Sequence, residues 1–313
     1  MQRISNIMNV FCRCVSIGAL MTLLISSAQA RTLDTAFGDV EIEGEPQRVV
    51  TLYEGALDVA MTAGVTPVAA IMTRGGEGVA RYLKDRVGDI AIVGTARETN
   101  IEAVVAQSPD VILASPRLSR EQYALLADIA PTVVPRTEGF SPDAWKGEAR
   151  LFGRALGHET EVDVAIEEIE RRAEDLAESL QDNGQPLGAH LVRWMPQGPL
   201  VMSDQLFSTG LLAATGFDVD DGGLVPEGRP HSDPLSLENL AQVDNDWLFM
   251  ATLNEDGDDA LASARESKAF GRLSAVEQDR VVPVDGQLWT SASGPMAASA
   301  ILDDIEANVL SSQ

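Results

Sequence analysis

The stretch ETEVDVAIEEIERRAEDLAESLQ, residues 159–181, predicts one long amphipathic helix in the middle of the chain. It contains no glycine or proline, and its apolar residues recur every three or four positions, which places them on one helix face. These residues are Val162, Ala165, Ile166, Ile169, Ala173, Leu176 and Leu180. The turn-forming run DNGQP, residues 182–186, ends the helix. A coiled-coil dimer would use the same stripe, but in an α/β chain we expect it to pack on the chain's own domains.

On both sides of this helix, short apolar strands alternate with helical stretches. RVVTLY, VTPVAAI and SPDVILAS read as strands before the helix, and AHLVRW, DWLFMAT and RVVPVD read as strands after it. This alternation is typical of mostly parallel sheets covered by helices. We therefore predict an α/β protein with two Rossmann-like lobes, residues 31–158 and 185–313, joined by the single long α-helix within residues 159–184.

The first 30 residues have the pattern of a cleaved secretion signal. Arg3 precedes an apolar run, Val15 to Ile25, and Ala28-Gln29-Ala30 has the small-x-small form of a signal-peptidase site. The run is shorter than the about 20 apolar residues that span a bilayer, although an uncleaved anchor would begin in the same way. Cleavage after Ala30 removes Cys12 and Cys14, so the mature chain has no thiol to act as nucleophile or zinc ligand.

The mature chain is strongly acidic. Without Arg3 and Arg13 it has 21 basic against 48 acidic residues, a net charge of about −27. Such a surface repels nucleic acid and anionic lipid, so we expect neither as a partner. His158, His190 and His231 are scattered, which makes a histidine metal site improbable, and we expect no resident metal or cofactor.

A series of short motifs, in a constant order, resembles one protein family along essentially the whole mature chain. In the first lobe they are EPQRVVTL, LDVAMTAGVTPVAAI, VGTARETNIEAVVAQSPDVILAS and LLADIAPTVV, and in the second LLAATGF, LSLENLAQVDNDWLFM, RVVPVDGQLW and GPMAASAILDDI. In this order they resemble the periplasmic substrate-binding proteins of ABC importers for iron-siderophores, haem and cobalamin, the class with a helical backbone. The resemblance implies a ligand cleft between the lobes, a periplasmic location, and a monomer that works with the transmembrane subunits of an ABC permease.

The second lobe looks most like the branch that binds ferric citrate and hydroxamate siderophores. The implied function is capture of a ferric siderophore of hydroxamate or citrate type and its delivery to a permease for iron uptake. The ligand would be the Fe(III)-siderophore complex, and the protein would not be an enzyme. Haem and cobalamin are the alternative ligands, because receptors for them share this architecture; Tyr53 would then be a candidate haem ligand.

Four arginines are candidate ligand contacts, because a guanidinium keeps its charge and donates paired hydrogen bonds to oxygen atoms. Arg193 ends the first strand of the second lobe, where relatives bring an arginine to the siderophore. Arg97 and Arg117 follow strands of the first lobe, at the edge where open α/β sheets bind ligands. Relatives place the first-lobe arginine at the position of Ala96, one residue earlier. Arg74, in the glycine-rich loop MTRGGEG, is the fourth candidate, with ordinary solvated loop charge as the alternative.

Aromatic residues make up only 5% of the chain, so those in predicted cleft loops are informative. Trp289 follows VDGQL, where relatives often place a tryptophan beside the ligand, and Trp194 adjoins Arg193. Flat aromatic faces of this kind can pack on a siderophore backbone. Core packing is the alternative for both residues, and a packed position at the end of a strand is the alternative for Tyr53.

Two glutamates are candidate permease contacts. Asn100 has the position of an N-cap, and a carboxylate such as Glu102 is favoured in the first helical turn by the helix dipole. Ser236 and Glu238 repeat the arrangement in the second lobe. In the resembled family these two glutamates project from corresponding surfaces of the two lobes and meet arginines of the two permease subunits.

Hydrolysis is the function from another class that the residues permit. Ser203-Asp204 and His231-Ser232-Asp233 supply serine, histidine and aspartate, but the chain has no G-x-S-x-G elbow, and His231 lies in a proline-rich loop. The phosphate-binding motifs G-x-G-x-x-G and G-x-x-x-x-G-K-[ST] are also absent from the sequence. We therefore expect a binding protein without catalysis.

Overall fold

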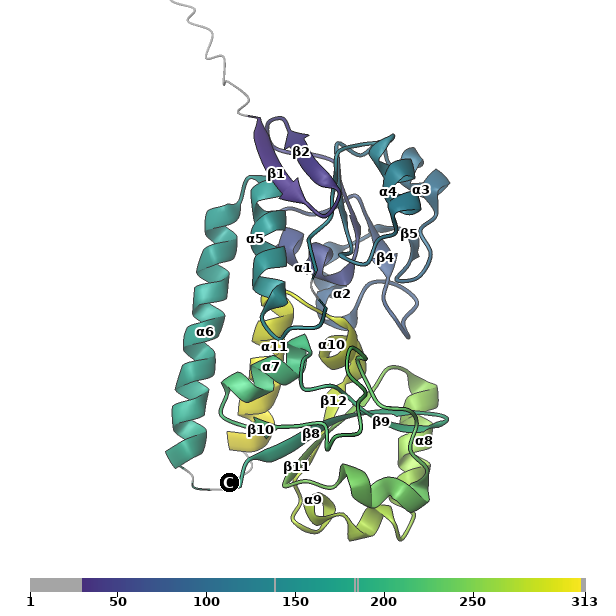
Figure 1. The fold of residues 1–313 in the computed structure, drawn as a ribbon, viewed down its shortest axis with the longest axis vertical. Coiled ribbons are helices and arrows are strands. Elements are labelled where there is room, and N and C mark those ends of the chain that lie inside the picture. The colour runs from purple at the N-terminus through teal and green to yellow at the C-terminus, as the bar shows by residue number, and fades with distance from the viewer. Residues whose placement is uncertain (1–29, 138, 183, 185, 311–313) are drawn as a thin grey trace, which may run out of the picture.

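The computed structural model describes residues 30–137, 139–182, 184 and 186–310. The predicted secretion signal, residues 1–30, lies outside the described residues except for Ala30. Figure 1 shows two lobes stacked along the long axis of the molecule, with the N-terminal lobe uppermost and helix α6 along one side of both. The predicted architecture of two α/β lobes joined by a long helix is confirmed.

The N-terminal lobe contains a five-stranded sheet in which all neighbouring strands are parallel, in the order β5-β4-β3-β6-β7. Its strands are β3 (Val49–Leu52), β4 (Ala69–Met72), β5 (Ala91–Thr95), β6 (Val111–Ala114) and β7 (Thr132–Val133). Its helices are α1 (Glu54–Thr62), α2 (Arg81–Val87), α3 (Ile101–Ala106) and α4 (Arg120–Ala127). Every residue of β3 and β6 is buried, as expected for central parallel strands with helices on both faces.

An antiparallel hairpin that the sequence analysis did not predict precedes this sheet. It consists of β1 (Arg31–Thr35) and β2 (Gly38–Ile42). Alternate residues are buried, since Leu33, Val40 and Ile42 join the core while their neighbours face solvent. The hairpin therefore covers one end of the core that continues into α5 (Ala144–Leu156).

The C-terminal lobe contains a second sheet, with parallel strands in the order β10-β8-β11-β12 and β9 antiparallel to β8. Its strands are β8 (Gly188–Met195), β9 (Gly198–Val201), β10 (Asp218–Val219), β11 (Trp247–Thr252) and β12 (Val281–Asp285). Its α-helices are α7 (Phe207–Ala214), α8 (Glu255–Arg265), α9 (Ser274–Glu277), α10 (Gly286–Ser291) and α11 (Pro295–Ile305), and the segment Leu237–Val243 forms the 3-10 helix η1.

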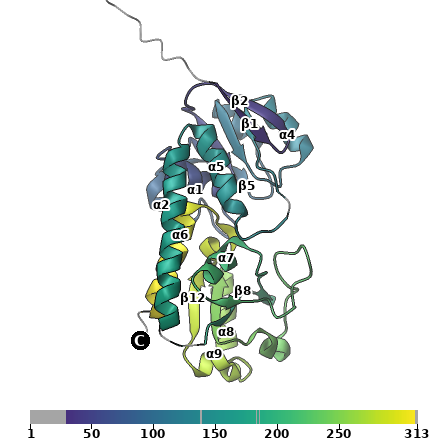
Figure 2. The same cartoon turned by 60° about the vertical axis from the view of Figure 1, so that its left-hand side comes forward.

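Helix α6 (Glu159–Asp182) uses its apolar stripe within the chain. The buried residues of the helix are Val162, Ile166, Ile169, Ala173, Leu176 and Leu180. They belong to one hydrophobic core that continues from β1 in the first lobe to α11 in the second, and α6 packs on α1, α5, α7 and α11. Figure 2 shows the helix lying along both lobes. The stripe is therefore covered by the chain itself, and no coiled-coil partner is needed to bury it.

Helix α11 makes a second connection between the lobes, which the sequence analysis did not predict. Asp58, on α1 of the first lobe, accepts hydrogen bonds from the backbone N–H groups of Met296 (2.9 Å) and Ala297 (2.8 Å) in the first turn of α11. It also accepts one from the Tyr82 hydroxyl at 2.8 Å. A fully buried carboxylate of one lobe thus caps a helix that follows the second sheet. We call this arrangement the Asp58 latch.

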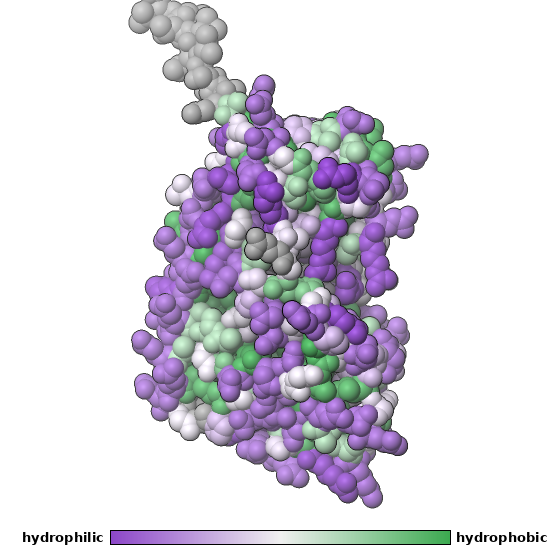
Figure 3. Space-filling view, viewed as in Figure 1, coloured by the Kyte–Doolittle hydropathy of each residue, from purple (hydrophilic) through white to green (hydrophobic). Residues whose placement is uncertain are grey.

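The surface is dominated by hydrophilic side chains, which cover most of the face shown in Figure 3. This agrees with the excess of acidic residues in the chain. Over the residues that the structure describes, no helix combines the length and the apolar composition that crossing a membrane requires.

Candidate functional site: a cleft between the lobes

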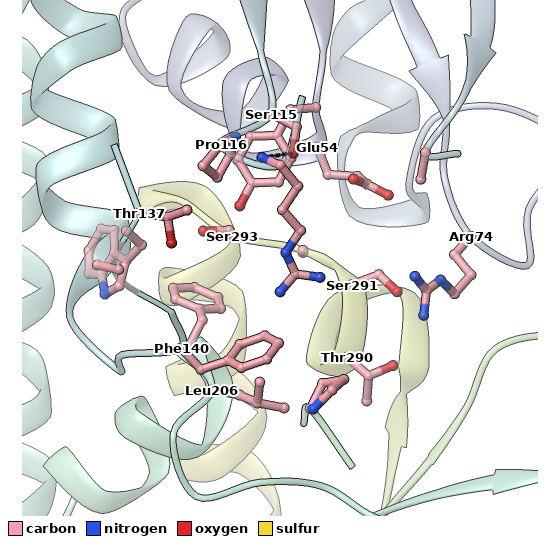
Figure 4. Close-up of a pocket in the computed structure, with 18 of the residues that line it drawn as sticks. Glu54, Arg74, Ser115, Pro116, Thr137, Phe140, Leu206, Thr290, Ser291 and Ser293 are labelled. Carbon is pink, nitrogen blue, oxygen red and sulfur yellow. Dashed lines mark hydrogen bonds between the residues drawn. The ribbon is translucent and has the colours of Figure 1, made fainter. Parts of the chain in front are cut away.

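A cleft lies where the two lobes meet, and residues of both line it. In the first lobe its lining includes residues at the carboxyl ends of β3, β5 and β6, which are Tyr53, Thr95 and Ser115. In the second lobe it includes Arg193, near the carboxyl end of β8. This is the edge of parallel sheets where ligands of α/β proteins bind. The segment from Trp289 to Ser293 and the residues around Phe140 complete the lining. Figure 4 shows lining side chains of both lobes around the shared space, among them Ser115 and Glu54 of the first lobe and Leu206 and Thr290 of the second.

Arg193 is the most unusual side chain of the cleft. It lies inside the second sheet, between Ala251 of β11 and Leu200 of β9, and is only 4% exposed. No described residue forms an ion pair or a hydrogen bond with its guanidinium, and its buried Nε has no partner. Burial, with the nearby charge of Arg74, lowers the pKa of Arg193 to about 10. A buried and unpaired cation is costly, so its partner is expected to come from outside the chain.

The other three predicted arginines also line the cleft, all from the first lobe. Arg74 lies in the loop after β4 and reaches into the space between the lobes (Figure 4). Arg117 follows β6 and lies over the ring of Phe140, with 4.6 Å between its Cζ and the ring centroid. Within the described residues, Arg74, Arg97 and Arg117 form no ion pair. The structure thus brings to one site four guanidinium groups that form no ion pair with any described residue, in a strongly acidic chain.

The loop that presents Arg97 is a tight turn that depends on Gly94. The backbone N–H of Thr95 donates to the Glu98 carbonyl at 2.8 Å, and the Thr95 hydroxyl accepts from the N–H groups of Arg97 and Glu98. Gly94 has φ of +147°, and a Cβ there would lie 2.4 Å from the Glu98 carbonyl oxygen. Both Ala96 and Arg97 line the cleft, so the one-residue difference from relatives leaves Arg97 as the charged group of this loop.

Apolar walls face the arginines, and sequence analysis missed most of them. Trp145, on α5, is buried and meets Phe207 edge to face, with 5.6 Å between ring centroids. Phe140 and Leu206 extend this wall from the two lobes (Figure 4). Phe140 and Trp145 lie just before and at the start of α5, in a region that carried no motif. Only the scarcity of aromatic residues in the chain could have drawn attention to them.

The two tryptophans predicted as ligand contacts are both core residues. Trp289 is among the residues that line the cleft, but it is 1% exposed, stacks on Phe249 and donates its indole N–H to Asp304 at 2.7 Å. Trp194 does not line the cleft at all. Its side chain points to the opposite face of β8 from Arg193, because successive residues of a strand alternate, and it packs on Phe270. The prediction that Trp194 contacts the ligand is therefore wrong.

Tyr53 lies in the cleft as the N-cap residue of α1. Ser293 of the second lobe and Glu148 of α5 are polar neighbours of its hydroxyl and both act on its pKa. Burial and the nearby carboxylate of Glu148 raise the pKa of Tyr53 far above its ordinary value. Burial also raises the pKa of Glu148 to about 7, although the neighbouring Tyr53 hydroxyl and the charge of Arg117 oppose that change. Polar groups of the first and second lobes thus meet beside Tyr53.

Stability should depend on pH near neutrality because of two buried carboxyl groups. Burial raises the pKa values of Asp58 and Glu148 to about 7, against ordinary values of 3.8 and 4.5. Between about pH 4 and pH 7 the folded chain therefore binds more protons than the unfolded chain, so the free energy of unfolding should decrease as pH rises through this range. Thermal unfolding at pH 5, 6, 7 and 8 should show this slope, and Asp58→Asn combined with Glu148→Gln should flatten it. An unchanged slope in the double variant would contradict the assignment.

The residues considered for hydrolysis do not form a catalytic triad. His231 lines the cleft, but its Nδ1 is 2.7 Å from the Ser232 carbonyl oxygen, and the Ser203 hydroxyl accepts from the backbone N–H of Gln205. No hydrogen bond between a serine hydroxyl and an imidazole occurs in the described part of the chain. Nor do three or more histidine, aspartate or glutamate side chains converge there in a way that could hold a metal ion.

The two glutamates predicted to meet the permease are both exposed and lie in different lobes. Glu102 is in the first turn of α3, whose N-cap Asn100 accepts from the Ala103 N–H at 3.0 Å, as predicted. Glu238 is in the first turn of η1, with Ser236 at its N-cap position. The predicted capping by Ser236 is wrong in one respect, because its side chain makes no capping hydrogen bond.

The molecule has two α/β lobes with helix α6 along both, and the cleft between them contains Arg193, which has no described charge partner. This arrangement defines a receptor that holds a ligand between its domains. The model of the family described as periplasmic binding protein matches residues 49–288, and the chain belongs to this family. Its architecture is that of the class III periplasmic binding proteins found in iron ABC importers.

Curated relatives and solved structures agree with this assignment. The chain is 27% identical over 292 residues to the probable siderophore-binding lipoprotein YfiY of Bacillus subtilis, covering 90% of this chain and 88% of the relative. It is 26% identical over 271 residues to the achromobactin-binding periplasmic protein of Dickeya dadantii, covering 83% and 85%. The crystal structure of Staphylococcus aureus SirA complexed with staphyloferrin B superposes with a TM-score of 0.77 at 27% identity, covering 90% of this chain and 98% of SirA.

Proposed function

We propose that this protein captures a ferric siderophore of the citrate, or carboxylate, type in its cleft and delivers it to an ABC permease for iron uptake. The observation that carries the proposal is the convergence of the buried Arg193 of the second lobe with the exposed Arg74 of the first lobe, with Arg97 and Arg117 lining the same cleft. A ligand that contacts both lobes and carries several carboxylates would pair with these cations. The sequence analysis left hydroxamate and citrate types open, and the four unpaired charges favour the citrate type.

The arginines favour iron that arrives inside a chelate rather than as a free ion. Guanidinium groups cannot bind a cation, but they donate hydrogen bonds to the oxygen atoms that surround a chelated ferric ion. The names of similar proteins support this ligand class, since they include the Fe(3+) dicitrate-binding periplasmic protein FecB of Escherichia coli, 24% identical over 286 residues. Apolar walls at Phe140, Trp145 and Leu206 would pack on the organic part of the chelate.

Haem is the weaker candidate because of the state of Tyr53. A tyrosine that ligates ferric haem does so through its phenolate oxygen. Here burial and the neighbouring Glu148 carboxylate hold the pKa of Tyr53 far above its usual value. Ionising it beside the Glu148 carboxylate would be unfavourable. No residue of the cleft specifically favours cobalamin.

Fluorescence titration of the chain lacking residues 1–30 tests the proposed function. Trp145 and Trp289 line the cleft, so a ferric chelate bound there should quench tryptophan emission. We expect saturable binding of ferric citrate at micromolar concentration or below, and weaker binding of a neutral ferric hydroxamate. Binding of haemin or cobalamin alone would overturn the ligand assignment, and binding of none of these would overturn the proposed function.

Transport should require Glu102 and Glu238 although ligand binding should not. Both are exposed and lie in different lobes, as a surface that contacts two permease subunits at once requires. Replacing each by arginine should reverse the charge of the contact and abolish iron uptake by cells, while fluorescence titration gives unchanged affinity. Glu178→Arg on the exposed face of α6 is the matched control and should leave uptake intact. Normal uptake by the Glu102→Arg, Glu238→Arg double variant would exclude this docking mode.

A periplasmic location and a monomeric state complete the proposal. The predicted signal sequence and the relatives described as periplasmic proteins or lipoproteins support export. The single core that joins both lobes and α6 supports a monomer that closes only slightly on its ligand. Neither nucleic acid nor membrane lipid fits the acidic surface.

A further inference from the structure

Two carboxylates share the cleft with the four arginines. Glu54, in the first turn of α1, and Glu148, on α5, both line it and both are partly buried. Burial is the main cause that raises the pKa of each, to about 7 for Glu148. Carboxylates are unexpected in the wall of a site for a polyanionic chelate, because they repel its charge.

Each carboxylate has polar neighbours in the first lobe. The Tyr53 hydroxyl lies close enough to Glu148 to act on its pKa. Glu54 accepts a hydrogen bond from the Thr73 hydroxyl at 3.5 Å. Figure 4 shows the Glu54 carboxylate directed into the space between the lobes. Groups oriented in this way before ligand arrives need little further ordering to bind it.

The two carboxylates do not serve to neutralise the charges of the cleft arginines. The charge of Arg117 acts on Glu148 and that of Arg74 acts on Glu54, but in the described structure neither pair comes within 4.0 Å. Long and flexible arginine side chains could make direct contact if pairing were their role. The cleft therefore presents separate groups of both signs, and a ligand complementary to it carries both signs as well.

We infer that Glu148 and Glu54 are specificity-determining residues that select a carboxylate chelate which also carries an ammonium group. The inference rests on the proposed function and narrows its ligand class. The carboxylates of the chelate meet Arg193 and Arg74, while its ammonium group meets the first-lobe wall formed by Glu54 and Glu148. A purely anionic chelate, such as ferric citrate, satisfies the arginines but gives neither glutamate a cationic partner.

Two matched synthetic chelators test the inference. The first is the monoamide of citrate with ethylenediamine, which has a free ammonium group, and the second is the same compound N-acetylated, which lacks the charge but keeps the iron-binding oxygens. Fluorescence titration with both ferric complexes at pH 8 should show about tenfold tighter binding of the ammonium form by the wild-type chain. In Glu148→Gln and Glu54→Gln this preference should disappear, and ferric citrate should bind as tightly as before or more tightly.

The controls separate this inference from the proposed function. Glutamine has the shape of glutamate without the charge, and circular dichroism with thermal unfolding verifies that each variant folds. Glu178→Gln, on the exposed face of α6 and outside the cleft lining, should keep the wild-type preference. Equal binding of the two chelates by the wild type, or an undiminished preference in both cleft variants, overturns the inference while the citrate assignment stands. If the wild type binds neither chelate nor ferric citrate, the proposed function itself fails.

Discussion

Replacing Arg193 by methionine should lower the affinity for ferric citrate about 100-fold and at the same time raise the thermal stability of the free protein. Loss of a buried group that forms charge-assisted hydrogen bonds with a ligand typically costs two to five kcal/mol of binding, about 30-fold to several thousandfold. In the free chain the same guanidinium is 4% exposed and has no partner among the described residues. Methionine fills a similar volume without a charge that must be desolvated.

The opposite signs of the two effects make this prediction specific. Fluorescence titration measures the affinity, and calorimetry without ligand measures the unfolding temperature. Arg229→Met is the matched control, because Arg229 is partly exposed and paired with Asp233, and it should change neither quantity appreciably. A variant of Arg193 that binds normally would remove the main support for the proposed site. One that binds weakly because it is destabilised would show that Arg193 has a structural partner.

Replacing Asp58 by alanine should lower the free energy of unfolding by about 3 kcal/mol or more. The change leaves the N–H groups of Met296 and Ala297 and the hydroxyl of Tyr82 without their acceptor in a buried site. Each unsatisfied buried group typically costs about 1–3 kcal/mol, and loss of a helix cap adds about 1 kcal/mol. The Asp58 latch connects the lobes directly behind the cleft segment that ends at Ser293, so ligand affinity should fall as well.

Denaturant unfolding of Asp58→Ala, Asp58→Asn and the exposed control Asp89→Ala checks this prediction. Asparagine keeps one acceptor oxygen and should lose less stability than alanine, whereas Asp89→Ala should be close to wild type, since Asp89 is on the surface. If Asp58→Ala unfolded at the wild-type denaturant concentration, the latch would contribute nothing to holding the lobes together. Retained stability with lost affinity would assign Asp58 to positioning of the cleft alone.

The local sequence pattern was sufficient to predict most elements and the class of fold. Strands such as β3 and β6 are continuous apolar runs, and α6 has an uninterrupted stripe, so their periodicity alone identifies them. The order of motifs then indicated the family, and the arginines at strand ends were correctly expected to lie at one edge. Arg193, Arg74, Arg97 and Arg117 all line the cleft.

The side-chain environments that could not be predicted from the sequence depend on contacts between residues far apart in the chain. Trp194 was predicted at the cleft because it adjoins Arg193, but the direction of a strand side chain is decided by register and by which face is covered, and here it packs on Phe270. In the sequence Asp58 is one polar residue of an amphipathic helix. Its two backbone partners, the N–H groups of Met296 and Ala297 in α11, are 238 and 239 residues away along the chain.

The sequence alone determined the central strands, the long helix α6, the two-lobe architecture and the presence of arginines at the ligand edge, because those features follow from local periodicity and strand polarity. Only the tertiary structure decided which charges are paired. Arg193 is left without a partner, Glu54 and Glu148 are held apart from the arginines, and Asp58 is buried against α11. Desolvation and charge pairing depend on all the atoms that surround a group, and the fold alone assembles those surroundings.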